Sequence, residues 1–296
     1  MVIPSNLKKG DKVGLIAPSG PPSQDNINSA TSIIKNMGLI PILGKYAKEN
    51  IGYLAGSDDA RAWDINDMFA NNSIKGIICL RGGYGCIRIL DKIDWNIVKE
   101  NPKFFIGYSD ITALHICINQ ICCFITYHGP MPTEEVILNE LSKETTESFK
   151  NSIFNNNLQN KNSNNFNLKI LISGNFSGQL VGGNLAVITS LLGTKYEINT
   201  DNKVLFLEDI GEPPYKVDGM LTQLKLCGKL KNLKGVILGS FVDEKKQDIP
   251  VNNIFKDTLQ PLGIPCLYDF PSGHSVPNIT FALGSIYTNE LHINIS

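Results

Sequence analysis

The sequence of 296 residues lacks an excess of charge of either sign, a long apolar run, and any pairing of cysteines at metal-binding spacing. It contains 27 Lys and Arg residues against 28 Asp and Glu residues, so no net electrostatic attraction favours nucleic acid as a partner. No apolar run reaches the ~18 residues of a membrane span, and the first residues show no signal-peptide core. These absences predict a cytoplasmic protein with neither a nucleic-acid nor a membrane partner.

Patterns typical of metal ligands are also absent. The seven cysteines show no C-x-x-C spacing and the four histidines form no H-x-x-x-H pair, so we expect neither a metal nor a cofactor. Most of the cysteines lie among Ile, Leu and Val, which predicts small buried apolar side chains in a reducing compartment.

Short apolar runs alternate with amphipathic stretches, which is typical of α/β proteins. Strands are expected over residues 12–17, 39–43, 75–80, 103–106, 174–181, 203–207, 235–238 and 291–295. Helices are expected over residues 26–37, 58–70 and 215–226, with another from residue 184. The early strands are continuous apolar runs, as in a mostly parallel sheet that helices cover on both faces.

An Asn-rich tract divides the chain. Nine of the seventeen residues from Asn151 to Asn167 are Asn, a composition too polar to bury a face. We therefore predict an amino-terminal domain over residues 1–150, a linker over 151–172, and a smaller carboxyl-terminal α/β domain over 173–296.

Ser109 follows an apolar strand and precedes a helical pattern with almost no loop between them. Gly107-Tyr108-Ser109 at such a junction is similar to a nucleophile elbow, which directs the next backbone N–H toward a developing oxyanion. The fifth position of the usual G-x-S-x-G is Ile111 here, and a serine in this place is also a common helix N-cap. Both interpretations of Ser109 stay open at this point.

A glycine-rich segment, Arg81-Gly82-Gly83-Tyr84-Gly85, follows the third expected strand. Ligands of open α/β sheets bind at such strand ends, and glycines allow the backbone N–H groups to approach them. The spacing fits neither G-K-[ST] nor G-x-G-x-x-G, so a nucleotide site is not predicted. Arg81 is a candidate ligand for a substrate carboxylate because guanidinium binds carboxylates in a bidentate manner, with a surface ion pair as the alternative.

A nucleophilic serine needs a base. We expect His292 to face solvent from the last strand and His115 to pack away from Ser109 on the following helix. His128 lies at a strand end and His274 lies in a turn-rich loop, and the sequence does not decide between them.

The base in turn needs an orienting acid. An apolar strand ends in Glu208-Asp209, and a carboxylate there can fix the tautomer of a histidine. The alternative for an acid in this region is a role at a helix N-terminus, which suits Glu212 better than Glu208.

Taken together, six motifs in order resemble the LD-carboxypeptidases, the serine peptidase family S66 that also contains the microcin C immunity proteins. They are Ala17-Pro18-Ser19-Gly20, Arg81-Gly82-Gly83-Tyr84-Gly85, Gly107-Tyr108-Ser109-Asp110, Gly182-Gly183-Asn184-Leu185, Leu207-Glu208-Asp209-Ile210-Gly211-Glu212 and Gly273-His274. The resemblance implies an amino-terminal domain similar to class I glutamine amidotransferases, a carboxyl-terminal domain of its own kind, a homodimer and no metal.

Matched motif by motif, the resemblance implies Ser109 as nucleophile, Glu208 as orienting acid and His274 as base. The implied oxyanion donors are the backbone N–H groups of Gly83 and Asp110. The implied activity is release of the terminal D-Ala from murein tetrapeptides during peptidoglycan recycling.

Two alternatives to this activity remain. One is hydrolysis of peptidyl or aminoacyl sulfamoyl adenylates, as in the immunity branch of the family, and the other is a non-catalytic muropeptide-binding protein. The sequence departs from the family at Gly219, which follows Asp218 where the family usually has Arg, and in its Asn-rich linker.

Overall fold

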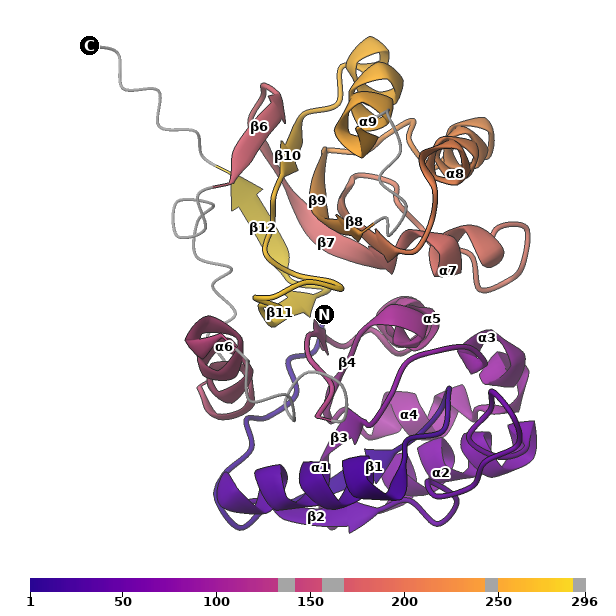
Figure 1. Cartoon of the computed structure of the whole chain (residues 1–296), viewed down its shortest axis with the longest axis vertical. Helices are drawn as coiled ribbons and strands as arrows, with labels where there is room; N and C mark the ends of the chain where they lie inside the picture. Colours follow the sequence, from indigo (N-terminus) through magenta and orange to yellow (C-terminus); the bar gives the residue numbers. More distant parts are fainter. Residues whose placement is uncertain (133–141, 156–167, 243–249, 290–296) are drawn as a thin grey trace. The chain divides into compact units, whose positions relative to one another are not determined.

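The computed structural model describes residues 1–132, 142–155, 168–242 and 250–289. The chain forms two compact units: unit 1 comprises Met1–Asn157 and Val276–Leu283, and unit 2 comprises Leu158–Ser275 and Gly284–Ser296. Each unit contains a six-stranded, mostly parallel sheet with helices packed on it (Figure 1). The predicted α/β class with two domains is therefore confirmed.

The sheet of unit 1 has five parallel strands and one antiparallel edge strand. Its order is β11 (Phe281–Leu283), β5 (Thr126–His128), β4 (Phe104–Gly107), β3 (Ile74–Cys79), β1 (Lys12–Ile16) and β2 (Ile40–Leu43). Every residue of β4 is buried, and so are five of the six in β3, as expected for strands covered on both faces.

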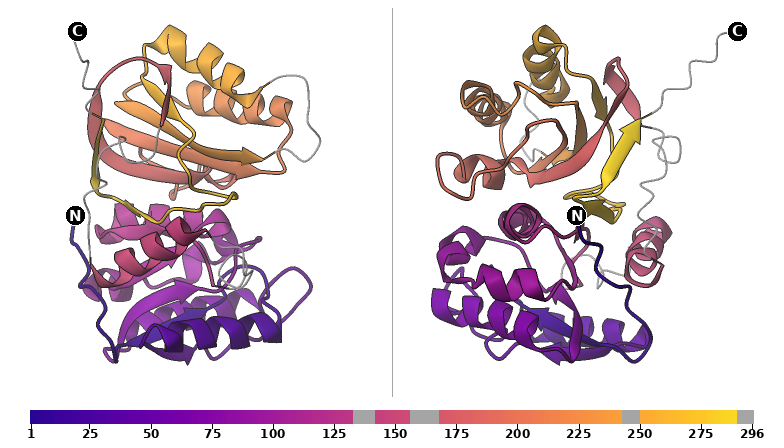
Figure 2. Two further views of the ribbon diagram at one scale, coloured as in Figure 1. Left: turned by 60° about the vertical axis from the view of Figure 1, so that its left-hand side comes forward. Right: turned by 180° about the vertical axis from the view of Figure 1, so that it is seen from behind.

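Helices cover both faces of this sheet (Figure 2). They are α1 (Gln24–Asn36), α2 (Asp58–Ala70), α3 (Cys86–Ile89), α4 (Trp95–Glu100), α5 (Thr112–Cys117) and α6 (Lys143–Phe154), with short helical turns at Leu90–Lys92, Ser109–Ile111 and Ile118–Cys122. The chain passes from β1 to β2 in one direction and through β3, β4 and β5 in the other, so right-handed crossovers put α1 opposite α2. The direction changes between β1 and β3, where open α/β sheets bind their ligands.

Unit 2 is built on a second sheet. Its order is β12 (Ile286–Asn289), β7 (Phe176–Asn184), β8 (Lys203–Ile210), β9 (Gly235–Val242), β10 (Cys266–Tyr268) and β6 (Lys169–Ile172), with β12 and β6 antiparallel at the two edges. The helices are α7 (Leu185–Ser190), α8 (Pro214–Leu226) and α9 (Val251–Leu259), followed by a turn at Gln260–Leu262. Helices α8 and α9 lie side by side against this sheet (Figure 1).

The Asn-rich tract differs from the predicted linker at both ends. Helix α6 runs to Phe154 because Phe149 and Ile153, four residues apart, are buried on one of its faces. Strand β6 begins at Lys169 and pairs with β10. Residues 156–167 lie outside the described residues, as do His292 and the strand expected over 291–295.

One segment of the predicted carboxyl-terminal domain belongs to unit 1. Strand β11 pairs antiparallel with β5, and Phe281 lies opposite His128 in this ladder. The two rings stack with centroids 5.0 Å apart. The boundary predicted at residue 173 is therefore wrong for Val276–Leu283, because strand pairing joins residues that are far apart in the chain.

We expect Phe281→Ala to lower the free energy of unfolding of unit 1 by about 3 kcal/mol, since it removes a ring that is only 5% exposed. Both tryptophans, Trp63 and Trp95, lie in unit 1, so urea denaturation followed by tryptophan fluorescence measures this unit. Ile286→Ala is the control, because Ile286 is 64% exposed in unit 2 and should leave the transition unchanged. An unchanged midpoint for Phe281→Ala would contradict the assignment of β11.

Candidate functional site

Ser109 occupies a strained turn directly after the buried strand β4. Its φ of 63° lies in the left-handed region, which costs free energy for a residue with a side chain and is found where function requires it. The N-cap position of the short helical turn is Tyr108, so Ser109 is not the cap that the alternative interpretation requires. The local geometry is that of a nucleophile elbow.

Gly107 accounts for the isoleucine at the fifth position of the motif. A Cβ on Gly107 would lie 3.0 Å from two side-chain carbons of Ile111 and 3.1 Å from Cβ of Cys79. Gly107, two residues before Ser109, therefore makes room for the side chain of Ile111.

The glycine-rich segment approaches Ser109 through its backbone. A Cβ on Gly82 would lie 2.9 Å from Cβ and 3.1 Å from Oγ of Ser109, so only glycine allows this approach. Gly83 has a φ of 110°, again a conformation that favours glycine. The segments that carry the predicted oxyanion donors, Gly83 and Asp110, thus flank Ser109 within unit 1.

The buried carboxylate of Asp110 joins the loops at this edge of the sheet. Its Oδ2 accepts hydrogen bonds from Ser19 Oγ at 2.6 Å and from the backbone N–H of Cys86 at 2.8 Å. Burial raises the pKa of Asp110, while these two donors act in the opposite direction. One side chain therefore links the loops after β1, β3 and β4.

Arg61, which the sequence analysis did not single out, bridges two of the same loops. Its side chain is fully buried on α2, and its Nη1 donates to the carbonyl oxygens of Pro18 and Gly85. Its Nη2 pairs with Asp58. The loops around Ser109 are thus fixed from inside by one buried carboxyl group and one buried guanidinium group.

Arg81 is half-buried and precedes Gly82, the glycine that lies against the side chain of Ser109. Its Nη1 donates to the carbonyl oxygen of Pro21 at 2.7 Å, which holds the guanidinium against the first loop. Its role as ligand for a substrate carboxylate stays a prediction.

In unit 2, Glu208 and His274 form a hydrogen-bonded pair. Glu208 lies near the end of β8 with no exposed surface, and its Oε2 lies 2.7 Å from Nδ1 of His274, whose side chain is 13% exposed. A carboxylate accepts, so Nδ1 carries the proton and Nε2 is left as the basic nitrogen. This is the pairing expected of a base and its orienting acid.

The other two described histidines are enclosed in unit 1. His115 contacts Thr126 Oγ1 at 2.8 Å and the carbonyl oxygen of Gly107 at 2.9 Å, and burial lowers its pKa to about 4. His128 is fully buried between the rings of Tyr108 and Phe281. The expected packing of His115 is confirmed, and the surroundings of His128 favour a structural role for it.

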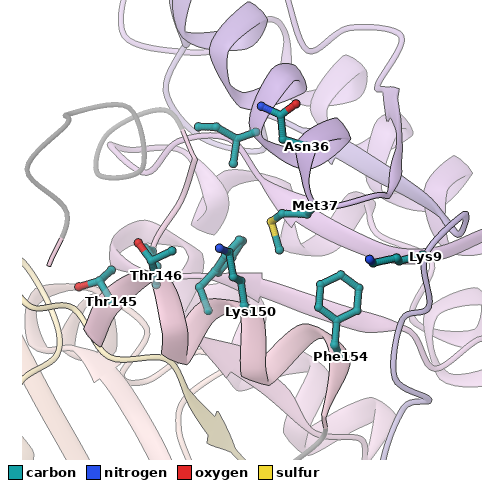
Figure 3. A pocket seen from close by; sticks show the side chains of 10 residues that line it. Lys9, Asn36, Met37, Thr145, Thr146, Lys150 and Phe154 are labelled. Atoms are coloured by element: carbon teal, nitrogen blue, oxygen red, sulfur yellow. The ribbon is translucent and has the colours of Figure 1, made fainter. Parts of the chain in front are cut away.

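A cavity of about 500 Å³ lies elsewhere in unit 1, where side chains of α1 and α6 face each other (Figure 3). None of the predicted site residues lines it. Within the described ranges, no three His, Cys, Asp or Glu side chains are grouped so that they could hold a metal ion. In that same part of the chain, no helix has the length and apolar character needed to cross a bilayer.

Comparison with known proteins covers both halves of the chain. Residues 13–129 match the LD-carboxypeptidase N-terminal domain and residues 177–288 match the LD-carboxypeptidase C-terminal domain. The "Probable murein peptide carboxypeptidase" of Bacillus subtilis (strain 168) is 38% identical over 286 residues, which cover 95% of this chain and 89% of that protein.

Two solved structures share the fold along almost the whole chain. An MccF-like protein from Bacillus anthracis str. Ames has a TM-score of 0.88 at 26% identity and covers 97% of this chain and 95% of its own. A muramoyltetrapeptide carboxypeptidase from Oxalobacter formigenes has a TM-score of 0.80 at 26% identity and covers 94% of each chain.

Most of the cysteines are buried, as expected, but Cys123 and Cys227 are exposed, and we expect iodoacetamide at neutral pH to label the native protein at these two. The other five are buried, and burial raises the pKa of the Cys122 thiol to about 12, so the thiolate that reacts is scarce. Peptide mass spectrometry measures the labelling. Rapid modification of Cys79 or Cys86 would instead indicate a thiol nucleophile beside the glycine-rich segment.

Proposed function

We propose, from the premise that this chain belongs to the LD-carboxypeptidase family of serine peptidases, that it releases the terminal D-Ala of murein tetrapeptides. The observation that carries the proposal is the strained φ of Ser109 at the end of a buried strand. The relative in Bacillus subtilis, named "Probable murein peptide carboxypeptidase", supports the substrate class.

In the proposed mechanism, Ser109 Oγ attacks the carbonyl carbon that precedes D-Ala while Nε2 of His274 takes its proton. Glu208 keeps the imidazole in the required tautomer and stabilises the imidazolium that forms. The backbone N–H groups of Gly83 and Asp110 stabilise the oxyanion. The imidazolium then returns the proton to the leaving amine of D-Ala, and a water molecule deprotonated by the same base hydrolyses the acyl-enzyme.

Arg81 is the residue we assign to the free carboxylate of D-Ala. A carboxypeptidase must recognise a terminal carboxylate, and a guanidinium beside the proposed oxyanion donors supplies the required charge. We further propose that the protein works as a homodimer in the cytoplasm, in the recycling of peptidoglycan, as the family resemblance implies.

A second candidate function is hydrolysis of a peptidyl or aminoacyl sulfamoyl adenylate. The likeness to the MccF-like structure from Bacillus anthracis supports it, because MccF is named as a microcin C7 self immunity protein. Both candidates use the same nucleophile and base, so only the substrate distinguishes them.

We expect Ser109→Ala to lower kcat by at least about 1000-fold without loss of the folded state, because removal of a nucleophile leaves only binding and oxyanion stabilisation. A fluorophosphonate probe should label Ser109 in the parent protein and identify an enzyme rather than a binding protein. Ser190→Ala is the matched control, since Ser190 is exposed on α7 and donates to the carbonyl oxygen of Val187. Activity near the parent level in Ser109→Ala would exclude the serine mechanism.

We expect His274→Ala to remove hydrolysis and to slow fluorophosphonate labelling of Ser109, because an unassisted hydroxyl is a weak nucleophile. His128→Phe keeps an aromatic ring between Tyr108 and Phe281 and should retain most of the activity. An inactive His128→Phe together with an active His274→Ala would transfer the role of base to His128.

We expect a tetrapeptide with D-Ala after an L-centre to be cleaved, and the all-L peptide of the same length to be spared. Inversion of a stereocentre moves the scissile carbonyl away from the oxyanion donors while the terminal carboxylate is held. Chromatography of the released amino acid measures kcat/KM for each peptide. Equal cleavage would contradict LD specificity, and a preference for a sulfamoyl adenylate would favour the second candidate.

A further inference from the structure

Three buried side-chain polar atoms of unit 2 have no hydrogen-bond partner among the residues that the structure describes. They are the hydroxyl of Tyr287 and two atoms that lie close together, Oε1 of Glu208 and Oγ of Ser240. His274 occupies only the other carboxylate oxygen, Oε2. A buried carboxylate with a single donor carries a large desolvation cost, and a buried hydroxyl without a partner adds its own. The carboxylate needs a donor, and the hydroxyl can supply one.

An irregularity in the sheet puts Ser240 beside Glu208. The β8–β9 ladder pairs Leu207 with Leu238 and Asp209 with Phe241, so Gly239 and Ser240 together oppose the single residue Glu208. Such bulges turn a side chain away from the regular alternation of the strand.

The loop that carries His274 packs onto the same place. A Cβ on Gly273 would lie 2.6 Å from Oγ of Ser240 and 2.8 Å from Oε2 of Glu208, so both polar groups line one side of this glycine. The backbone N–H of Ser240 donates to the carbonyl oxygen of Ser272 at 3.0 Å. Ser240 is thus bound to the loop of His274 through its backbone and lies next to Glu208 through its side chain.

The neighbouring acid, Asp209, has its own donors. Its carboxylate accepts from Nδ2 of Asn184 and from the backbone N–H groups of Ala186 and Ile210. Burial, followed by the nearby charge of Glu208, raises the pKa of Asp209 to about 6. An ionised Asp209 can only accept hydrogen bonds, so it cannot donate one to the carboxylate of Glu208.

We propose that Ser240 is a positioning residue for Glu208, the orienting acid. Rotation about the Cα–Cβ bond of Ser240 directs its hydroxyl onto Oε1 of Glu208. The inference rests on the proposed function of the Glu208–His274 pair. With this second donor, the carboxylate of Glu208 is held in place and its Oε2 stays aimed at Nδ1 of His274 while the imidazolium forms.

The first test compares Ser240→Ala with Ser240→Thr, which keeps the hydroxyl. We expect Ser240→Ala to lower kcat/KM roughly tenfold, the effect of one hydrogen bond to a charged group, mainly through kcat. The acid limb of its pH profile should move to higher pH, because a carboxylate with one donor fewer attracts the proton of the His274 imidazolium more strongly. Ser240→Thr should restore both quantities, and Ser190→Ala should change neither.

The second test needs no turnover. Proton NMR of the Ser109→Ala protein detects the downfield Nδ1 proton of His274 in its bond to Glu208, and Ser240→Ala should shift this resonance while Ser240→Thr should not. An unchanged resonance and acid limb in Ser240→Ala would overturn the inference, even with a lower melting temperature. If the parent protein cleaves no substrate, the proposed function fails, and the resonance still decides the role of Ser240.

Discussion

The burial of two carboxylates, Asp110 in unit 1 and Glu208 in unit 2, is the constraint on which the described arrangement depends. Each has lost its hydration and must find donors on neighbouring segments. Asp110 takes them from Ser19 and Cys86, and Glu208 takes one from His274. In each unit, the hydrogen bonds to one buried carboxyl group fix the loops that supply the donors. The strand pairing of the sheet alone would not fix these loops.

Close backbone approach is the second requirement, and glycine meets it in both units. Gly82 lets the loop after β3 reach the side chain of Ser109, and Gly273 lets the loop of His274 reach Glu208. A methyl group on Gly82 would lie within 3 Å of the side chain of Ser109, and one on Gly273 within 3 Å of the side chain of Glu208. The glycines are therefore part of the geometry of each site, because they set the distance between loop and side chain.

Local patterns predicted the local features of this protein. The continuous apolar runs identified β1, β3, β4 and β8, and the strand ends led to Ser109 and Glu208. The sequence could not decide between His128 and His274, because enclosure by Phe281 and pairing with Glu208 are long-range contacts. The same limit hid the membership of β11 in unit 1, the burial of Arg61, and Ser240, whose position depends on a bulge between two strands.

The turn at Ser109 has the backbone strain of a nucleophile elbow without the complete sequence motif. The usual second glycine relieves crowding around the strained serine. Here the crowding is relieved at two other places: Gly107 makes room for Ile111, and Gly82 makes room for Ser109 itself. The left-handed φ of Ser109 persists because the surrounding core, buried throughout β4, determines it. The letters G-x-S-x-G are incomplete around Ser109, whereas the strained serine with space around it is present.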